Sequence, residues 1–269
     1  MKAQVYSITG QKKSQIELPI QFSEEIRTDL IKRAVHSIQA NSRQPYGSDP
    51  NAGTRQGNST PKRRKRFGTT YGYGISRVKR KVMWNRGTRF GWVASFVANA
   101  VGGRKAFPPL AEKVYSQKIN KKEKRLAIRS AIAATLSKDL VISRGHKINN
   151  VSLPIIVESK IESLSKTKQV SELFKKLNLI AELERTAEKK VRAGVSRLRG
   201  RKYKIKKGPL FVVSKKCSLQ KSSKNILGVD VCEVSNLNAE LLAPGTQPGR
   251  LVIWSEDAIK EMNEKRLFV

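Results

Sequence analysis

The sequence predicts an α/β fold in three layers: a mostly parallel sheet with helices on both faces, interrupted by one long extended basic loop. Outside residues 43–105, short apolar runs alternate with helical patterns, as in proteins with parallel strands. Inside residues 43–105, neither helical nor strand periodicity persists. We therefore expect residues 1–42 and 106–269 to form a single α/β globular domain and residues 43–105 to form an extended loop.

The N-terminal flank begins with the strand-like run VYSI and continues with an amphipathic helix. Ser23 is a favourable N-cap residue, and Glu24 and Glu25 suit the positive end of a helix dipole. The cap and the periodicity predict about 17 helical residues. The apolar face of this helix consists of Ile26, Leu30, Ala34, Val35 and Ile38.

The C-terminal flank supplies the remaining helices and strands. Asn120 and Glu123 match the capping-box pattern ahead of a helix whose stripe is Leu126, Ala127, Ala131 and Ala134. A further helix carries Val170, Leu173, Phe174 and Leu177, and Ser255, followed by Glu256 and Asp257, caps a final one. The short apolar runs expected as strands are residues 140–142, 153–157, 210–213, 229–234 and 251–254.

The net charge restricts the class of partner. The chain has 55 Lys and Arg against 21 Asp and Glu, a formal net charge of +34. Such a charge works against the compact state unless a polyanion neutralises it, and nucleic acid is the leading candidate. A membrane surface is the main competitor, but there is no apolar signal core at the start and no apolar run of about 18 residues. We expect a cytoplasmic protein with no membrane partner.

The two cysteines do not indicate a metal site or a disulfide framework. Cys217 and Cys232 are too few and too far apart for paired CxxC zinc ligands. They are expected to be core thiols of a protein from a reducing compartment.

Residues 43–105 have the composition of an RNA-binding segment. They contain 15 Lys or Arg and one acid, Asp49, with 10 of the 18 glycines and 8 of the 17 aromatic residues. Cations at short spacing meet phosphates, aromatic rings stack on unpaired bases, and glycines let the backbone pass through narrow gaps. Taken alone, the densest run, residues 62–66, is as consistent with a solvated charge run or a nuclear-localisation-like patch as with RNA binding. The predicted RNA-binding residues here are Arg43, Arg55, Lys62, Arg63, Arg64, Lys65, Arg66, Tyr71, Tyr73, Arg77, Lys79, Arg80, Lys81, Trp84, Arg86, Arg89, Trp92, Arg104 and Lys105.

A second cationic stretch lies at residues 189–207, with ten Lys or Arg and no acid. The end of a helix attracts cations, but ten charges exceed what a helix dipole can use. Gly200 is expected to end the helix and leave the residues after it in a loop before the strand at Leu210. The predicted RNA-binding residues of this stretch are Arg192, Arg197, Arg199, Arg201, Lys202, Tyr203, Lys204, Lys206 and Lys207.

No catalytic constellation is apparent in the sequence. His36 and His146 lack HxH, HExxH or HxE context, and Asp230 and Glu233 near a strand end have no companion pair for a metal nuclease. The fragment beginning at Gly72 lacks the third glycine of a dinucleotide fingerprint. We predict no catalytic residue, metal, cofactor or small-molecule substrate. The alternatives are an RNA-modifying or RNA-cleaving enzyme with a basic substrate arm and, third, a DNA-packaging protein.

Long segments of the chain resemble one family. Four segments are similar to the universal large-subunit ribosomal protein number four in its archaeal and eukaryotic form. They are SIQANSRQPYGSDPNAGTR, KKEKRLAIRSAIAATLSKDLVISRGH, RAGVSRLRGRKYKIKKGPLFVVS and LNAELLAPGTQPGRLVIWSEDAI. The resemblance implies a structural constituent of the large ribosomal subunit. It further implies a three-layer α/β domain, and a loop that runs through large-subunit rRNA to the wall of the peptide exit tunnel.

The resemblance also implies partners and a position for the loop tip. The partners are large-subunit rRNA and neighbouring ribosomal proteins, including universal large-subunit protein number twenty-two at the tunnel constriction. The distal part of the loop corresponds best to residues 77–103, where relatives often have a tip of the GGGGTGR kind. This chain has VMWNRGTR there, starting at Val82. It lacks the long C-terminal extension usual in eukaryotic members, from which we expect an archaeal source.

Overall fold

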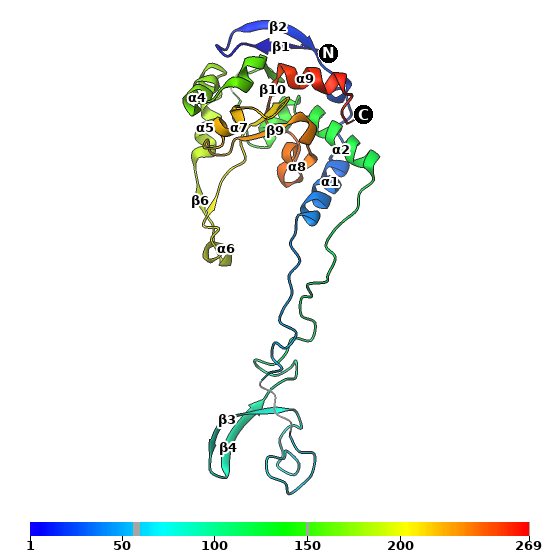
Figure 1. The fold of residues 1–269 in the computed structure, drawn as a ribbon, viewed down its shortest axis with the longest axis vertical. Coiled ribbons are helices and arrows are strands. Elements are labelled where there is room, and N and C mark those ends of the chain that lie inside the picture. The colour runs from blue at the N-terminus through cyan, green and yellow to red at the C-terminus, as the bar shows by residue number, and fades with distance from the viewer. Residues whose placement is uncertain (56–59, 149–150, 269) are drawn as a thin grey trace. The chain divides into compact units, whose positions relative to one another are not determined.

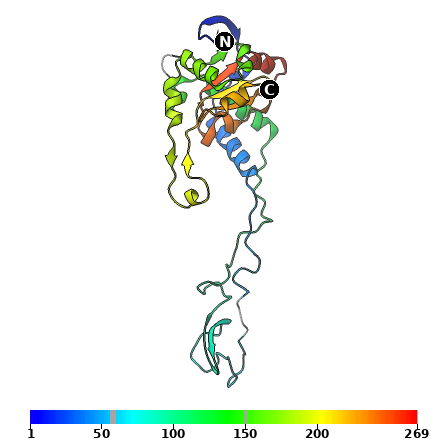
Figure 2. The same cartoon turned by 60° about the vertical axis from the view of Figure 1, so that its left-hand side comes forward.

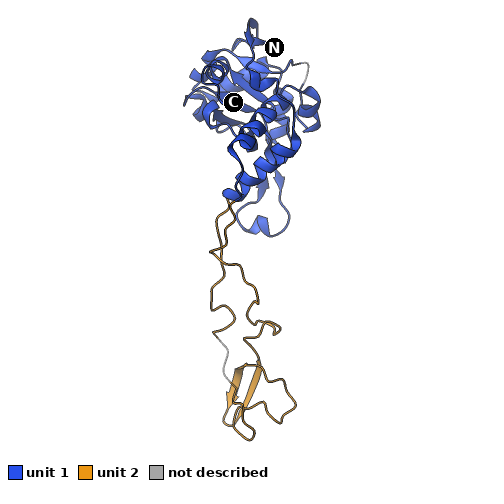
Figure 3. Ribbon diagram, turned by 90° about the vertical axis from the view of Figure 1, so that its right-hand side faces the viewer, with its two compact units in different colours: residues 1–42, 117–269 blue, residues 43–116 orange. Residues whose placement is uncertain are grey.

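The computed structural model describes residues 1–55, 60–148 and 151–268. This part of the chain divides into two compact units. Unit 1 comprises residues 1–42 and 117–269, and unit 2 comprises residues 43–116 (Figure 3).

Unit 1 is built on a sheet that has six strands in the described residues, in the order β2-β1-β5-β10-β8-β9. β1 and β2 form an antiparallel hairpin at one edge, and the other neighbouring strands are parallel. The prediction of a mostly parallel sheet is therefore confirmed. The strands are β1 (Lys2–Tyr6), β2 (Lys12–Glu17), β5 (Ile155–Val157), β8 (Leu210–Val213), β9 (Asp230–Glu233) and β10 (Val252–Ser255).

Helices cover both faces of this sheet (Figure 1). On one face lie η1 (Ile20–Phe22), α1 (Thr28–Asn41), α2 (Lys121–Ala134), η3 (Val234–Asn236), α8 (Ala239–Leu242) and α9 (Glu256–Glu264). On the other lie α3 (Lys138–Ser143), η2 (Ser159–Ser163), α4 (Thr167–Lys176), α5 (Ile180–Ala187) and α7 (Leu219–Ser223). A short helix, η4 (Pro244–Thr246), follows α8.

The strand side chains alternate between two hydrophobic clusters. On β8, Leu210 and Val212 belong to the cluster under α1 and α2, whereas Phe211 and Val213 belong to the cluster under α4. Successive side chains of a strand point to opposite faces, so a strand covered on both faces is apolar throughout. This explains why residues 210–213 read as a continuous apolar run, and why that prediction matches β8.

The β1–β2 hairpin is joined to β5 by one carboxylate. Glu158 accepts hydrogen bonds from the Ile8 amide at 3.1 Å, the Ser7 hydroxyl at 3.0 Å and the Lys13 ammonium at 3.0 Å. The Ile8 amide and Lys13 hold the pKa of Glu158 at about 2, because they stabilise its ionised form. The hairpin itself was only partly predicted: VYSI overlaps β1, whereas β2, with its largely polar sequence, was not foreseen.

The first helix begins later than predicted. α1 starts at Thr28 and has 14 residues, so Ser23 is not its N-cap. The Ser23 hydroxyl donates to the Ile20 carbonyl instead, and Ile26 is exposed. The reason is tertiary: Ser130 of α2 accepts a hydrogen bond from the Arg27 amide and donates one to the Glu25 carbonyl. These bonds hold residues 24–27 in a non-helical conformation.

Residues 140–142 were predicted as a strand, and this was wrong. They lie in α3, where Val141 is fully buried and Ile142 is 47 % exposed. A strand buried on both faces would hide both side chains, whereas a surface helix buries only those on one face. An apolar run this short does not distinguish the two structures.

The other predicted elements of unit 1 are present. Val170, Leu173 and Phe174 are buried on α4, and the Ser255 hydroxyl caps α9 by accepting a hydrogen bond from the Ala258 amide at 3.1 Å. α2 begins directly after Asn120, as predicted, but without the capping-box hydrogen bonds. Glu123 pairs with Arg33 of α1 instead, at 3.0 Å.

A basic arm projects from unit 1 between α5 and β8 (Figure 2). It contains β6 (Lys190–Val191), the four-residue helix α6 (Val195–Leu198) and β7 (Tyr203–Lys204), with β6 and β7 paired antiparallel. Gly200 has a φ of 75° after α6, consistent with its expected role in ending a helix. Tyr203 and Lys204, predicted in a loop, lie in β7, because the chain turns back onto β6.

Unit 2 contains a β-hairpin where no periodicity was predicted. β3 (Arg80–Arg86) and β4 (Arg89–Ala94) pair antiparallel. A register irregularity between Val82 and Trp84 breaks the alternation, and the consecutive residues Val82, Met83 and Trp84 are all exposed. Strand alternation is therefore absent from the sequence because the hairpin is bulged and has little core to face.

Unit 1 should fold without unit 2. The two ends at which unit 2 joins unit 1 lie close together, because the Asn41 side chain accepts a hydrogen bond from the Gln117 amide at 2.9 Å. Replacing residues 43–116 with a short Gly-Ser linker should therefore close a short loop at small entropic cost. We expect one cooperative transition in calorimetry, with the α/β circular-dichroism signature retained. A chain that unfolds without a transition would show that unit 2 is needed for the fold.

Candidate nucleic-acid interface

The hairpin of unit 2 places two arginines opposite each other at its turn. β3 ends at Arg86, β4 begins at Arg89, and the two are paired across the strands. Gly87, at the first position of the two-residue turn, has a φ of 58°, which suits glycine. Both arginines are exposed. Like charges directly opposite each other destabilise a strand pair, so this arrangement favours an anion at the turn.

Trp84 lies on one face of the same hairpin. It pairs with Gly91, and a side chain at Gly91 would collide with the indole: a Cβ there would lie 2.0 Å from Trp84 Nε1. Gly91 therefore leaves room for the ring to lie across the neighbouring strand. Phe90 and Trp92, the residues on either side of Gly91, point to the opposite face. The hairpin thus carries aromatic side chains on both faces, and Trp84 is 56 % exposed.

Several of the predicted cations lie against aromatic rings of unit 2. The Arg77 guanidinium lies 4.5 Å from the Tyr71 ring centre, and Arg80 lies 5.5 Å from Trp92. Lys79 and Arg104 both lie near Phe96, at 4.1 and 5.9 Å. Cation–π contacts position a charge without neutralising it. These side chains are therefore oriented and still able to attract phosphate.

The run at residues 62–66 is exposed and folds into successive turns. Lys65 has a φ of 55°, which is unusual for a residue with a side chain, and Gly68 has a φ of 71°. Unit 2 holds 16 Lys and Arg, and its acids are Asp49 and Glu112. Asp49 pairs with Arg55. The acids of unit 2 are therefore too few to neutralise its cations.

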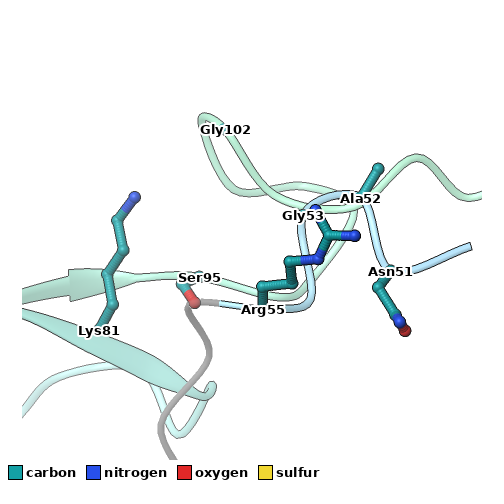
Figure 4. A pocket seen from close by; sticks show the side chains of 7 residues that line it. All are labelled: Asn51, Ala52, Gly53, Arg55, Lys81, Ser95 and Gly102. Carbon is teal, nitrogen blue, oxygen red and sulfur yellow. The ribbon is translucent and has the colours of Figure 1, made fainter. Parts of the chain in front are cut away.

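The remaining predicted residues of unit 2 lie in β3 and in the loops outside the hairpin. Arg55 and Lys81 line a pocket of about 260 Å³ together with Asn51, Ala52, Gly53, Ser95 and Gly102 (Figure 4). Arg104 and Lys105 are exposed. Arg43 lies 4.1 Å from the ring centre of Tyr115, which stacks on Tyr46 at 6.2 Å. The prediction missed Tyr46 and Tyr115, which lie far apart in sequence, so no local pattern indicates their pairing.

The arm of unit 1 carries the second group of predicted residues. Arg192, Arg197, Arg199, Arg201 and Lys202 are all exposed. Tyr203 of β7 is 48 % exposed, with the Lys202 and Lys189 ammonium groups 5.3 and 6.0 Å from its ring centre. Leu198, on α6, is 86 % exposed. The arm thus presents cations and exposed apolar side chains on a two-stranded support.

Ion pairs, one of them made by a buried arginine, fix the C-terminal root of this arm. Arg250, with no exposed side-chain surface, donates to the Gly208 carbonyl at 2.9 Å and pairs with Asp230. Lys207 also pairs with Asp230, at 3.0 Å, and Lys206 pairs with Glu188, at 2.7 Å. Of the predicted cations in the arm, Lys206 and Lys207 are therefore held at its root. Asp230, considered above as a nuclease carboxylate, serves as their structural partner.

A second buried cluster lies beside this root. Glu182 is fully buried and contacts His146 Nδ1 at 2.6 Å and Arg185 at 2.7 Å, and Arg185 donates to the Lys207 carbonyl. His146 Nε2 accepts the Leu251 amide, so its Nδ1 carries the proton that is donated to Glu182. Although burial alone would raise the pKa of Glu182, its bonds to Arg185 and His146 hold it at about 2. Burial lowers the pKa of His146. Both ring nitrogens of His146 are therefore engaged in hydrogen bonds within the protein.

Polar side chains bond one another at the carboxyl ends of β8 and β10, in the region where many α/β proteins bind ligands. Glu162 of η2 accepts hydrogen bonds from the Ser214 amide at 2.8 Å and the Ser255 hydroxyl at 2.7 Å. Its other oxygen accepts the Ser214 hydroxyl at 2.8 Å. Ser159 donates to Asp257 nearby, at 2.6 Å. The polar groups at this edge thus bond one another.

The structure also bears on a metal site, a membrane-spanning segment and reactive cysteines. Across residues 1–55, 60–148 and 151–268, no three His, Cys, Asp or Glu gather in a way that could hold a metal ion. The same residues contain no helix long and apolar enough to cross a membrane. Cys232 is buried and Cys217 is partly exposed, and both are free thiols. Burial raises the pKa of Cys232 to about 11 and also raises that of Cys217, so both stay protonated.

Replacing Glu182 with Gln should destabilise unit 1 and change its pH dependence. The change leaves Arg185 without its buried counter-ion, which costs about 3 kcal/mol. The ionised Glu182 stabilises the fold above its ordinary pKa, and this contribution is lost as pH falls towards 2. The lowered pKa of His146 acts in the same direction, with a loss that begins as pH falls below about 6.5.

Urea unfolding at pH 7, 5 and 4 measures both effects. Glu182→Gln should be much less stable than the wild type at pH 7 and should lose less further stability between pH 5 and 4. Glu184, on the same helix, is exposed, so Glu184→Gln is the matched control and should behave like the wild type. Equal stability of the two variants would contradict this account of the cluster.

Comparisons with known proteins identify the family of this chain. Residues 16–265 match the model of the ribosomal protein L4/L1 family. The chain is 51 % identical to the large ribosomal subunit protein uL4 of Nanoarchaeum equitans, over the full length of both proteins. It is 43 % identical to the proteins of the same name from Methanosphaera stadtmanae and Archaeoglobus fulgidus, over 98 % of this chain and 96 % and 99 % of theirs. Each of these names denotes a protein of the large ribosomal subunit. The resemblance seen in the sequence is confirmed, and the chain belongs to the ribosomal protein L4/L1 family.

Proposed function

We propose that this protein is a structural constituent of the large ribosomal subunit in the cytoplasm, and that it binds large-subunit rRNA through two basic surfaces. One surface is unit 2, and the other is the arm at residues 189–207. The observation that carries the proposal is the excess of 16 Lys and Arg over two acids in unit 2. The family and the names of its members support the same assignment.

The type of nucleic acid follows from the mixture of cations and rings. Duplex DNA is bound mainly through phosphates and groove edges, with little use for exposed aromatic rings. Single-stranded and looped RNA offers unpaired bases on which such rings stack. Phe67, Tyr73 and Trp84 are each more than half exposed in unit 2. Folded rRNA therefore fits this surface better than duplex DNA.

Within this function, we propose that the β3–β4 turn lies at the wall of the peptide exit tunnel. The resemblance to the family implies this position, and Arg86 and Arg89 support it, because paired like charges need surrounding phosphate. The partner protein at that point is universal large-subunit protein number twenty-two. The arm at residues 189–207 is expected to bind rRNA elsewhere and to help attach unit 1 to the particle.

Binding to an rRNA transcript should weaken steeply with salt. If half of the 15 cations of residues 43–105 contact phosphates, the plot of log K against log salt should have a slope of about −5 or steeper. Replacing Arg63, Arg64 and Arg66 with Ala should make the slope shallower by about 2. The matched control replaces Lys12, Lys168 and Lys175, which are exposed in unit 1, with Ala. It should change the slope less than the arginine variant does. A wild-type slope near −1 would mean that these cations are not the binding surface.

Replacing Arg86 and Arg89 with Glu should disturb rRNA locally without detaching the protein. Two carboxylates would be set among phosphates, whereas the arm and the rest of unit 2 would still bind. Chemical probing of mutant particles should show changed reactivity at tunnel-wall nucleotides. The control, Lys168 and Lys175 of unit 1 changed to Glu, should leave these nucleotides unchanged. Changes confined to the outer surface of the particle would place the hairpin turn elsewhere.

A further inference from the structure

Unit 2 contains a pocket lined by aromatic rings, which the binding of phosphates by cations does not explain. Its volume is about 530 Å³, and its walls include Phe67, Tyr73, Phe90 and Trp92 with Lys65 and Arg66 at the same site. Phosphate contacts require cations but not a hollow lined by four aromatic rings. The pocket therefore indicates a ligand with a flat or apolar part as well as negative charge.

The rings are arranged so that flat surface stays open. Phe90 and Trp92 share one face of β4, and their ring centres are 5.1 Å apart at an interplanar angle of 85°. Phe67 meets Phe90 in a second edge-to-face contact, 5.2 Å away at 60°. Edge-to-face contacts leave ring faces uncovered. Phe67 is 69 % exposed and Tyr73 is 67 % exposed, so both rings have free surface.

The backbone that carries Phe67 is fixed by hydrogen bonds. The Thr69 amide donates to the Arg66 carbonyl, and the Thr69 hydroxyl donates to the Pro61 carbonyl at 3.1 Å. The same hydroxyl accepts the Tyr71 amide at 3.2 Å, and Thr69 is only 3 % exposed. A Cβ added at Gly68 would meet no atom within 4 Å, so open space adjoins this turn. The turn that carries Phe67 is thus held in place by its own hydrogen bonds.

We propose that this pocket binds an unpaired RNA base, which stacks on Phe67 and Tyr73 while Lys65 and Arg66 contact the flanking phosphates. This proposal rests on the proposed function and specifies the form of RNA at one point of unit 2. Every base has a flat π surface, and a base displaced from its helix leaves its phosphates close by. An apolar side chain of a neighbouring protein would fit the rings but would gain nothing from the two cations.

The test compares RNA with and without bases. The full chain is titrated with a single-stranded adenosine decamer and with a decamer of the same backbone that lacks all bases. The variant Phe67→Leu/Tyr73→Leu keeps apolar side chains but removes both exposed rings. Phe107→Leu is the matched control, since Phe107 is 98 % exposed in the same unit and does not line the pocket. An rRNA transcript is titrated with salt in parallel.

The wild type and Phe107→Leu should bind the adenosine decamer at least about tenfold more tightly than the abasic one, and the preference should persist at high salt. The double variant should lose this preference and keep the steep salt dependence. Equal binding of both decamers by the wild type, with that dependence intact, would overturn the pocket proposal alone. An unchanged preference in the double variant would also overturn the pocket proposal. If that variant is in addition lost from ribosomal particles, the pocket binds a side chain of a neighbouring protein instead. A flat salt dependence on the transcript would instead overturn the proposed function.

Discussion

The fold of this molecule depends on where its few carboxylates lie, since 21 acids cannot neutralise 55 Lys and Arg. Unit 1 uses several of them at joints where chain segments meet. Glu158 joins the edge hairpin to β5, Glu182 joins α5 to the loop at His146, and Asp230 joins β9 to the root of the arm. The fold is thus held by local neutralisation where desolvated charges would be costly. Unit 2 and the arm together hold 26 of the 55 Lys and Arg with only two acids between them, and an external polyanion would offset this local repulsion.

The position of one carboxylate also distinguishes this α/β domain from enzymes with a similar sheet. In open parallel sheets, ligands usually bind beyond the carboxyl ends of the strands. Here Glu162 occupies that region and accepts hydrogen bonds from Ser214 and Ser255. A carboxylate in this place would repel a phosphate ligand. The polar groups at this edge of the sheet thus bond one another, whereas the densest runs of exposed cations lie on the arm and on unit 2. This agrees with membership of a ribosomal protein family.

The sequence predicts the parts of this fold that depend on local patterns, and fails where a distant contact decides. Residues 210–213 could be predicted because burial on both faces leaves a continuous apolar run. Ser255 could be predicted because its cap is local. The start of α1 could not, because Ser130, a hundred residues away along the chain, holds the Arg27 amide. The β3–β4 hairpin lacks the alternation that normally reveals a strand. In the candidate interface, composition indicated the cations, but the grouping of Phe67 with Phe90 and Trp92 needed the structure.

Charge and aromatic rings contribute different properties to RNA binding. Phosphate attraction acts over about a Debye length, is screened by salt and depends little on sequence or on the conformation of the bases. Stacking acts only at contact and requires a base that is already unpaired. A basic segment alone would therefore bind any folded RNA. In the proposed pocket, Lys65 and Arg66 adjoin exposed rings, an arrangement that would favour RNA with an unstacked base beside its phosphates. Phe90 and Trp92 lie on a hairpin of fixed register, so the proposed pocket would require one local geometry of the bound base, which phosphate attraction alone does not impose.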